Sequence, residues 1–328
     1  MTIAARIPIA ELTPGIRLEQ VFVVSQPQLR TTTRGDHYIA AFLSDRTGKL
    51  NSRMWQASPE LYEGLPQEGL MLVRGRTETY QGALQMVVDA FLPVEAGELD
   101  YTDFLPQTRC DIDVMFTRLT EILGTIEDPD LGALVQAFLA DGDLVALLRQ
   151  APAAAALHHA WIGGLLEHTL SVLEVACSVL PHYPQLDRDL VLAGVFLHDI
   201  GKTTELEYDV SFRYSDQGRL LSHVVKGALL IQEKVTELEM RTGVSFPVGK
   251  RDCLTHIILS HHGTREFGAP VLPATPEAFF VHCLDNLDSK IALTLAEIGK
   301  DLSPSAWTSY IRAIEGPLYK MRADGQPR

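Results

Sequence analysis

Histidine and aspartate residues in the second half of the chain have the chemistry of a metal site. They lie in five separate stretches, which are His168, His198–Asp199, His223, His261–His262 and Asp285. Because these stretches are far apart in sequence, only the fold can bring them together. Imidazole nitrogen and carboxylate oxygen suit divalent transition metals, and a shared carboxylate can join two of them. The set therefore predicts a two-metal site and metal-assisted hydrolysis, most simply of a phosphate ester.

Asp199 is the expected bridge between the two metals. It directly follows His198 at the end of the apolar run LVLAGVFLHDIGK, which turns at Gly201. A carboxylate buried beside an imidazole costs several kcal/mol unless a cation or a hydrogen-bond network compensates it. Lys202 lies four residues after His198 and is expected to reach a substrate phosphate, and a solvated lysine at a helix end is the alternative interpretation. We therefore expect Asp199 and Lys202 to be catalytic.

The same residue types have structural interpretations when each is taken alone. His168, His223 and Asp285 stand in apolar surroundings, where a single histidine is commonly a hydrogen-bonded core residue. His158 and His159 could line a cleft at the metal site or lie at the surface. The joint order of the ligand-type residues is what favours metal binding.

The composition excludes some classes of protein. The 328 residues are 46% hydrophobic and 21% charged, which allows two ordinary domains with buried cores. A formal net charge of −14 argues against a protein that coats nucleic acid, although it permits an enzyme that acts on nucleic acid. The N-terminus lacks a signal-peptide pattern, no stretch approaches ~20 apolar residues, and the four cysteines form no close pair. We therefore expect a reduced, cytoplasmic protein that does not enter a membrane.

Residues 1–95 are expected to form an OB-type barrel. Apolar and polar residues alternate there in short runs, which are separated by turns at 45–48 and 80–82. A segment that could be a short helix or a loop separates the third run from the fourth. The five predicted strands are 15–26, 37–45, 49–56, 69–80 and 83–94. Five strands with that insertion fit a small closed barrel.

Such a barrel predicts contact with single-stranded nucleic acid. OB barrels that bind single strands offer aromatic rings for base stacking and basic residues for the backbone. The predicted contact residues are Arg30, Arg34, Tyr38, Arg53, Trp55, Arg74 and Arg76, with Phe42 as a further aromatic candidate. Phe42 and Trp55 could instead belong to the barrel core, and residues 30–34 could be a solvated basic loop.

The rest of the chain is expected to be helical. Residues 96–110 lose the strand alternation and carry acids and a proline, so they are expected to be a linker. Apolar residues at helical spacing then predict an all-α domain over 111–300, interrupted by a small β-hairpin around Asp209. The helix after this hairpin is expected to begin at His223. Residues 301–328 are expected to form a C-terminal helical tail. The predicted fold class is a multidomain α and β protein, with a five-stranded barrel followed by a helical domain.

The order of the ligand-type residues resembles that of the HD-domain superfamily of metal-dependent phosphohydrolases. By that resemblance the second domain would be of the HD type. One metal would be held by His168, His198, Asp199 and Asp285. The other would be held by Asp199, His223 and His261, with His262 as a neighbour or an additional ligand.

A closer resemblance is to the YhaM family of 3′–5′ exoribonucleases. It rests on GGLLEHTLSV, FLHDIGK, LLSHVVKGA and the block from Leu259 to Lys290, joined to an N-terminal OB module, and it covers essentially the whole chain. HDIGK alone is shared with many HD phosphohydrolases, whereas the long block with a barrel is specific. The resemblance implies hydrolysis of single-stranded RNA to nucleoside 5′-monophosphates, with single-stranded DNA as a second candidate substrate. It implies two divalent metal ions, Mn²⁺ or Co²⁺, and the ligands also permit Fe²⁺ or Zn²⁺.

Three other functions stay open from the sequence. The first is an HD-type hydrolase of a small nucleotide or cyclic dinucleotide, in which the barrel serves oligomerisation. The second is a nucleic-acid-binding protein whose metal site is structural. The third is oxidative di-iron chemistry, which the barrel disfavours. An oligomer is compatible with each of these functions.

Overall fold

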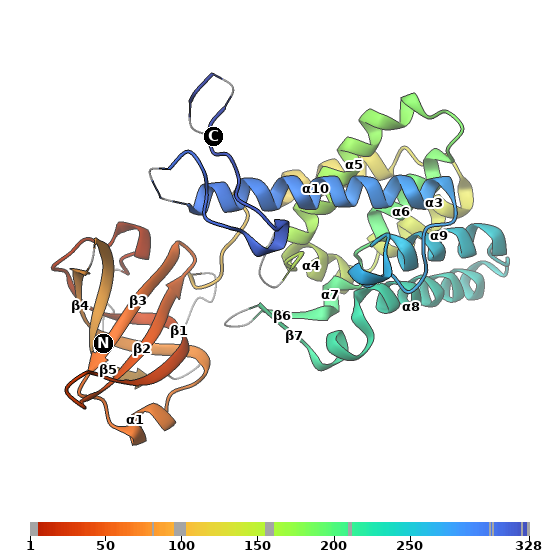
Figure 1. Cartoon of the computed structure of the whole chain (residues 1–328). Helices are drawn as coiled ribbons and strands as arrows, with labels where there is room; N and C mark the ends of the chain where they lie inside the picture. Colours follow the sequence, from red (N-terminus) through yellow and green to blue (C-terminus); the bar gives the residue numbers. More distant parts are fainter. Residues whose placement is uncertain are drawn as a thin grey trace. The chain divides into compact units, whose positions relative to one another are not determined.

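Two compact units make up the chain (Figure 1). The computed structural model describes residues 6–80, 82–94, 103–154, 161–208, 212–301, 303, 305–322 and 324–326. The first unit is Met1–Gln107 with Glu207–Arg213, and the second is Thr108–Leu206 with Tyr214–Arg328. The division after Gln107 falls inside the predicted linker 96–110, of which residues 96–102 lie outside the described part. The other predicted domain limits, at residues 95 and 300, stay predictions.

The first unit is a closed five-stranded barrel, as the sequence predicted. Its elements are β1 (Arg17–Thr31), β2 (His37–Asp45), β3 (Gly48–Trp55), α1 (Pro59–Glu63), β4 (Glu68–Tyr80) and β5 (Ala83–Pro93). The strand order is β1-β2-β3-β5-β4, and β1 pairs with both β2 and β4 to close the sheet. β3 and β5 are parallel, whereas the other strand pairs of the barrel are antiparallel. This is an OB-type arrangement.

Alternating side chains fill the interior of the barrel. Phe22 and Val24 from β1, Ile39 from β2, Val73 from β4 and Met86 from β5 are each completely buried. Neighbours such as Tyr38 and Arg74 lie on the opposite face, because successive side chains of a strand point to opposite faces. The period-two pattern of the sequence therefore sets which side chains remain available on the outer surface.

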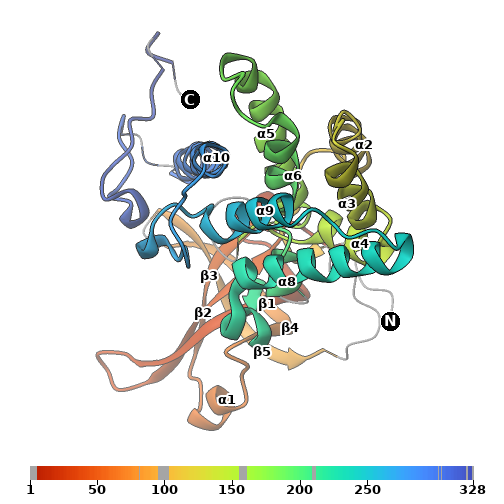
Figure 2. The ribbon, with the colours of Figure 1, turned by 90° about the vertical axis from the view of Figure 1, so that its right-hand side faces the viewer.

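The second unit is a set of packed helices, and it confirms the predicted helical domain with a small β-hairpin. Its helices are α2 (Ile112–Leu123), α3 (Pro129–Leu139), α4 (Gly142–Gln150), α5 (Gly164–Val179), α6 (Arg188–Leu197), α7 (Lys202–Glu205), α8 (Asp216–Thr242), α9 (Val248–Ser260) and α10 (Pro276–Lys300). The hairpin strands, β6 (Leu206–Tyr208) and β7 (Phe212–Tyr214), are divided between the two units, because Glu207–Arg213 is grouped with the first unit. Every residue of α6 from Leu190 to Leu197 is buried, and α6 packs against α5, α9 and α10 (Figure 2). The apolar run that ends in His198 therefore carries that residue into the interior.

Two elements start or end differently from the sequence-based prediction. β1 continues beyond the predicted end at residue 26, because a bulge between Ser25 and Gln28 shifts its register against β2. α8 begins at Asp216 rather than at His223, and it is bent at Ser222, whose φ of 56° and ψ of 160° are not helical. The bend lies directly before a predicted metal ligand.

The predicted C-terminal helical tail is wrong. α10 ends at Lys300, and the described residues beyond it contain a 3-10 turn at Arg312–Ile314 and a β-bridge between Trp307 and Tyr319. Apolar residues at helical spacing led to the prediction, but Gly316–Pro317 follows within the same stretch. Proline lacks the backbone donor that a helix interior requires, and glycine disfavours helix as well.

Among the described residues, no single helix has the length and apolar composition of a membrane span. The pair α3 and α4, bent by 76°, meets that test only when the two helices are taken together.

Gly201 allows the start of α7 to lie close against α8. A Cβ atom at this position would overlap the carbonyl oxygen of His223 and press on the amide of Gly227. We expect Gly201→Ala to lower the free energy of unfolding by about 3 kcal/mol, because overpacking against backbone forces the two segments apart. Chemical denaturation followed by circular dichroism measures this change.

Gly299→Ala is the matched control, since Gly299 lies in α10 with nothing within 4 Å of an added Cβ atom. Alanine is the better helix former, so this variant should be as stable as the parent protein or slightly more stable. Equal stability of the two variants would mean that the close approach at Gly201 is unimportant.

Candidate metal centre

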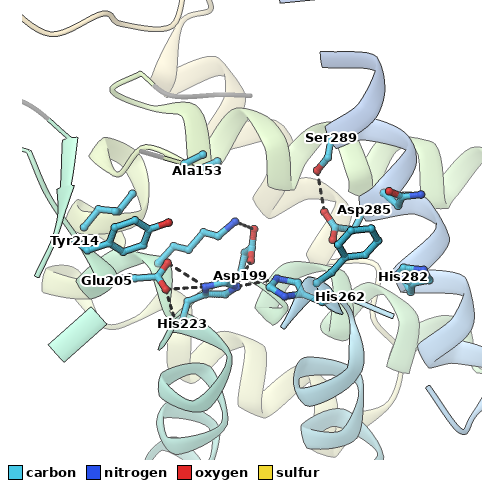
Figure 3. A pocket seen from close by; sticks show the side chains of 14 residues that line it. Ala153, Asp199, Glu205, Tyr214, His223, His262, His282, Asp285 and Ser289 are labelled. Atoms are coloured by element: carbon cyan, nitrogen blue, oxygen red, sulfur yellow. Dashed lines mark hydrogen bonds and ion pairs between the residues drawn. The ribbon is translucent and has the colours of Figure 1, made fainter. Parts of the chain in front are cut away.

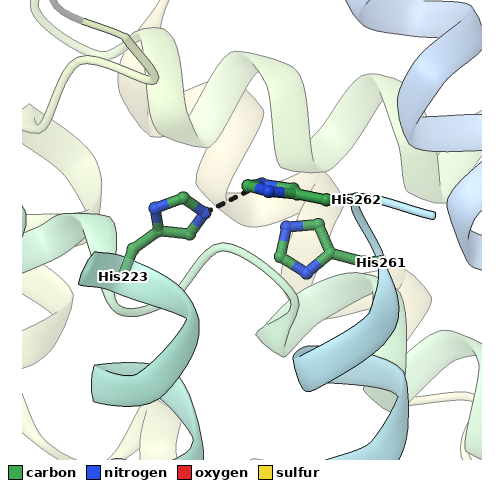
Figure 4. Close-up of side chains that lie close together, drawn as sticks. All are labelled: His223, His261 and His262. Carbon is green, nitrogen blue, oxygen red and sulfur yellow. Dashed lines mark hydrogen bonds between the residues drawn. The ribbon is translucent and has the colours of Figure 1, made fainter. Parts of the chain in front are cut away.

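The fold brings all seven predicted ligand residues together. They are His168 from α5, His198 and Asp199 from the end of α6, His223 from α8, His261 and His262 from the end of α9, and Asp285 from α10. Their ligand atoms form two groups, His168 with His198 and Asp285, and His223 with His261 and His262; within each group the atoms lie within 4.8 Å of one another. Figure 4 shows the second group. Five helices thus contribute to two neighbouring candidate metal sites.

Asp199 lies between the two groups and presents one oxygen to each. Its Oδ2 is 3.4 Å from His198 Nε2 and 3.7 Å from His168 Nε2. Its Oδ1 is 3.4 Å from His223 Nε2 and 3.5 Å from His261 Nε2. A carboxylate placed in this way suits the bridging position of a two-metal site.

Three buried polar atoms of the centre lack a hydrogen-bond partner among the described residues. They are Asp199 Oδ1, His261 Nε2 and His262 Nδ1. Asp199 is 2% exposed and His261 is 1% exposed, so water cannot easily compensate them. Leaving a buried polar atom unpaired costs roughly 1–3 kcal/mol. A divalent cation satisfies lone pairs of this kind, and the nitrogen and oxygen atoms present fit one.

Main-chain carbonyl groups orient two of the histidines. His198 Nδ1 donates to the oxygen of Val195, and His261 Nδ1 donates to the oxygen of Ile258, at 2.7 Å in both cases. These carbonyls belong to the last turns of α6 and α9, where no helical N–H group is available to pair with them. The Nε2 atom of each ring consequently faces the centre. The ends of the two helices therefore set the orientation of both rings.

Two carboxylates that the sequence analysis missed orient the other two rings. Asp288 accepts from His168 Nδ1 at 2.7 Å and from Ser171 Oγ at 2.5 Å. Glu205 accepts from the main-chain N–H and from Nδ1 of His223, at 2.9 Å each (Figure 3). A carboxylate behind a ligand histidine fixes the ring and its tautomer and makes the facing nitrogen more basic.

The two groups differ in their electrostatics. Burial lowers the pKa of His168, but hydrogen bonds to Asp285 and Asp288 outweigh burial and raise this pKa to about 9. Burial, with a smaller effect of the neighbouring imidazoles, lowers the pKa of His262 to about 3. Burial also lowers the pKa of His261. His261 and His262 are therefore neutral at neutral pH, whereas a cation that binds at His168 would displace a proton.

Lys202 is the charged partner of Asp199. Its Nζ lies 2.6 Å from Asp199 Oδ2, and its side chain is 13% exposed. Burial opposes the charged form of Lys202, but the adjacent carboxylate raises its pKa, so the amine stays protonated. Burial likewise opposes ionisation of Asp199, and Lys202 and His198 hold its pKa well below the usual range. The centre thus contains a protonated amine whose charge is offset by the carboxylate of Asp199.

A cavity of about 490 Å³ is lined by part of this centre (Figure 3). Asp199, Lys202 and Asp285 contribute to its ionic part. Its volume lies in the range of pockets that bind small organic ligands. The predicted cleft residues His158 and His159 lie outside the described residues.

Four of the predicted nucleic-acid contact residues share one outer region of the barrel. Strand pairing aligns Arg30 with Tyr38, and Tyr38 with Trp55. The rings of Tyr38 and Trp55 lie 5.0 Å apart, and the Arg53 guanidinium is 5.8 Å from the Trp55 ring. Trp55 is 44% exposed, so its interpretation as barrel core is wrong.

A second cavity, of about 310 Å³, lies on this part of the barrel and adds Tyr80, which the sequence analysis missed. Phe42 lines this cavity and is not part of the barrel core, and Lys49 Nζ lies 4.0 Å from the centre of its ring. Tyr80 also lines the cavity, with the Arg53 guanidinium 4.6 Å from its ring. Tyr80 follows the alternation of a predicted strand, so its outward direction could have been found from the sequence.

The remaining predicted arginines are exposed but do not line this cavity. Arg74 forms an ion pair with Glu19, with Nε 2.8 Å from the carboxylate. Arg76 is exposed on β4, and Arg34 lies in the exposed turn between β1 and β2. Arg74 differs from Arg53, because a neighbouring carboxylate already offsets its charge.

The fold and the centre together define a protein of the HD class with an N-terminal OB-type barrel. The family model described as "HD domain" matches residues 165–290, which include all seven predicted metal ligands. The 3′–5′ exoribonuclease YhaM of Geobacillus sp. (strain WCH70) is 32% identical to this chain over 303 residues, which span 92% of this chain and 90% of the relative. The chain belongs to the YhaM family.

A solved structure is similar to the barrel. It is the solution NMR structure of the second OB-fold domain of replication protein A from Methanococcus maripaludis. The identity is 20%, the match covers 28% of this chain and 98% of that chain, and the TM-score is 0.23. The OB-type assignment rests on the strand pairing of the barrel itself.

The carboxylates behind His168 and His223 give a prediction about metal affinity. Asp288→Asn should weaken binding at the group that contains His168, and Glu205→Gln at the group that contains His223. Each loss should be roughly 10- to 100-fold, because a neutral amide orients and activates the imidazole less well. Calorimetric titration with Mn²⁺ and the metal content after dialysis measure the effect separately from activity.

Asp252→Asn is the control for these two variants, since Asp252 pairs with Arg251 and its side chain is 62% exposed. Its metal affinity should equal that of the parent protein. Unchanged affinity in both Asp288→Asn and Glu205→Gln would show that the two carboxylates only stabilise the fold.

Proposed function

We propose that the protein is a metal-dependent 3′–5′ exoribonuclease, which shortens single-stranded RNA to nucleoside 5′-monophosphates. The observation that carries the proposal is the position of Asp199 between two groups of buried histidines, in a chain of the YhaM family. Two divalent cations at such a centre supply Lewis-acid activation of water and neutralise charge on the attacking and leaving oxygens. Mn²⁺ or Co²⁺ is the proposed metal, and Fe²⁺ and Zn²⁺ suit the same ligands.

The grouping of the ligand atoms supports an assignment of each residue. The first cation would be held by His168, His198, Asp199 and Asp285, and the second by Asp199, His223, His261 and His262. Lys202 would exchange its contact with Asp199 for a non-bridging oxygen of the scissile phosphate. Its ammonium group would then offset the charge that develops on that phosphate.

The barrel is proposed to bind the part of the RNA strand that precedes its 3′ end. Tyr38 and Trp55 would stack on bases, and Arg30 and Arg53 would contact the backbone, as in other OB barrels that bind single strands. Arg34, Arg74 and Arg76 are proposed as weaker backbone contacts. A tethered strand raises the local concentration of its 3′ end at the metal centre. Single-stranded DNA is a second proposed substrate, and the cytoplasm is the proposed location.

The direct test is an exonuclease assay with the full chain. A 5′-labelled single-stranded RNA incubated with Mn²⁺ should give a ladder that shortens from the 3′ end and releases mononucleotides, and EDTA should stop the reaction. Asp199→Asn should lower the rate at least about 1,000-fold, because it removes charge from the bridging position. Electrophoresis and chromatography of the products measure both effects.

Asp252→Asn is the control and should cleave at the parental rate. Turnover of a free or cyclic nucleotide without any shortening of RNA would overturn the proposal in favour of a small-nucleotide hydrolase. RNA binding without turnover in any divalent metal would instead support a structural metal site.

The barrel assignment predicts different losses on long and short substrates. Trp55→Ala should weaken binding of a long single strand by roughly 5- to 150-fold, the range of one lost base stack. It should leave cleavage of a dinucleotide unchanged, since a dinucleotide has no further strand for the barrel to bind. Fluorescence anisotropy and steady-state kinetics measure the two quantities.

Two arginines provide a matched comparison for the backbone contacts. Arg53→Ala should weaken binding of the long strand more than Arg74→Ala, because Glu19 already offsets the charge of Arg74. If Trp55→Ala lowered activity equally on the long strand and on the dinucleotide, the proposal that the barrel binds the strand would be refuted.

A further inference from the structure

Part of the 490 Å³ cavity is lined by residues with apolar or aromatic side chains. These residues include Ala153, Ala154, Leu206, Tyr214 and Phe267. In Figure 3, Tyr214 lies on the side of Glu205 and His223, while Asp285 and Ser289 lie on the opposite side. The cavity thus combines an ionic part with an apolar and aromatic part. A phosphate alone would use the ionic part only.

The two aromatic rings of this cavity are largely exposed. Tyr214 is 47% exposed and Phe267 is 65% exposed, so neither ring belongs to the core of the helical unit. Single exposed apolar residues are common on protein surfaces and need no explanation. Tyr214 and Phe267, however, are not single exposed residues, because both line one cavity. The same cavity is also lined by Asp199 and Lys202. The position of the two rings would allow a flat, apolar group of a ligand to lie against them.

The backbone that carries Tyr214 is held in place by hydrogen bonds. Ser215, the next residue, donates its N–H to the oxygen of Glu205 at 3.0 Å and its hydroxyl to the oxygen of Thr204 at 3.1 Å. The hydroxyl of Ser215 also accepts from the N–H of Gly218 at the start of α8. The position of Tyr214 is therefore fixed relative to the metal-centre segment that contains Glu205.

Phe267 lies in a turn that is fixed in a similar way. Its N–H donates to the carbonyl and to the hydroxyl of Thr264, at 3.2 Å and 3.3 Å. Gly268 follows with a φ of 95°, which glycine adopts without strain, and Ala269 donates back to the oxygen of Thr264 at 3.1 Å. Because both residues lie on hydrogen-bonded backbone, no ordering of the main chain is needed when a ligand stacks on their rings.

We propose that Tyr214 and Phe267 form a stacking subsite for the bases of the last two nucleotides at the 3′ end, a proposal that rests on the exonuclease function above. The scissile phosphate lies between these two nucleotides, so their bases flank the ionic part of the cavity when the phosphate occupies it. Aromatic rings stack on any base, because every base has a π-face. Such a subsite would hold the end of the strand without selecting its sequence.

The test combines removal of each aromatic ring with removal of each base, as in a double-mutant cycle. The full-length protein and its Tyr214→Ala and Phe267→Ala variants are compared on a short RNA whose last or second-last nucleotide either carries its base or is abasic. In the parent protein, loss of a stacked base should lower kcat/KM by roughly 5- to 150-fold. The alanine variant of the ring that stacks on that base should lose kcat/KM by the same factor on intact RNA. It should lose nothing more on RNA that lacks the base, because the effects of removing two groups in contact do not add.

Conservative and control variants separate stacking from stability. Tyr214→Phe and Phe267→Tyr should restore the parental kcat/KM, because both keep a ring. Phe279→Ala and Tyr310→Ala are the controls, since these residues are 55% and 67% exposed and do not line the cavity. Both controls should cleave at the parental rate with the parental penalty for an abasic end.

The outcomes separate this proposal from the function on which it rests. If the parent protein shortens RNA but neither ring is coupled to either base, the stacking subsite is refuted and the exonuclease function stands. If the parent protein does not shorten RNA at all, the exonuclease function itself fails.

Discussion

A single buried carboxylate is the constraint on which the helical unit depends. Asp199 can face both histidine groups only because α6 runs through the interior and ends there, followed by Gly201, which allows α7 to approach His223. Burial of a carboxylate is unfavourable without compensating charge. Lys202 supplies one positive charge at 2.6 Å, and the orphaned Oδ1 remains available for a cation. The position of Asp199 therefore depends on the packing of α6 and on the way this helix ends. Its charge depends on Lys202 and on the groups that surround it.

The imidazole rings around Asp199 are oriented by two different means. Carbonyl groups at helix ends hold His198 and His261, so these rings depend on local backbone alone. Carboxylates from other elements hold His168 and His223, so these rings depend on tertiary packing. Each ligand group contains one ring of each kind. This arrangement fixes four Nε2 atoms toward the centre while leaving the two groups with different protonation behaviour.

The net charge of −14 does not conflict with a polyanionic substrate, because the positive charge is local. Arg53 lies among the aromatic rings of the outer barrel face, where cation and ring can bind a strand together. In the cavity, the ammonium group of Lys202 is a local positive charge, and divalent cations at the two candidate sites would reverse the local sign. Some of the acidic residues form ion pairs at the surface, as Asp252 does with Arg251.

The sequence by itself determined the strands, most of the helices and the ligand types, because hydrophobic period and residue chemistry are local properties. Asp288 could have been found as well, since it follows Asp285 by three residues on one helix. Only the tertiary structure decided that His262 joins the group of His223 and that Glu205 holds that ring. These contacts join residues far apart in sequence and depend on the bend at the start of α8 and on the direction of each side chain, which the packing of several helices sets together.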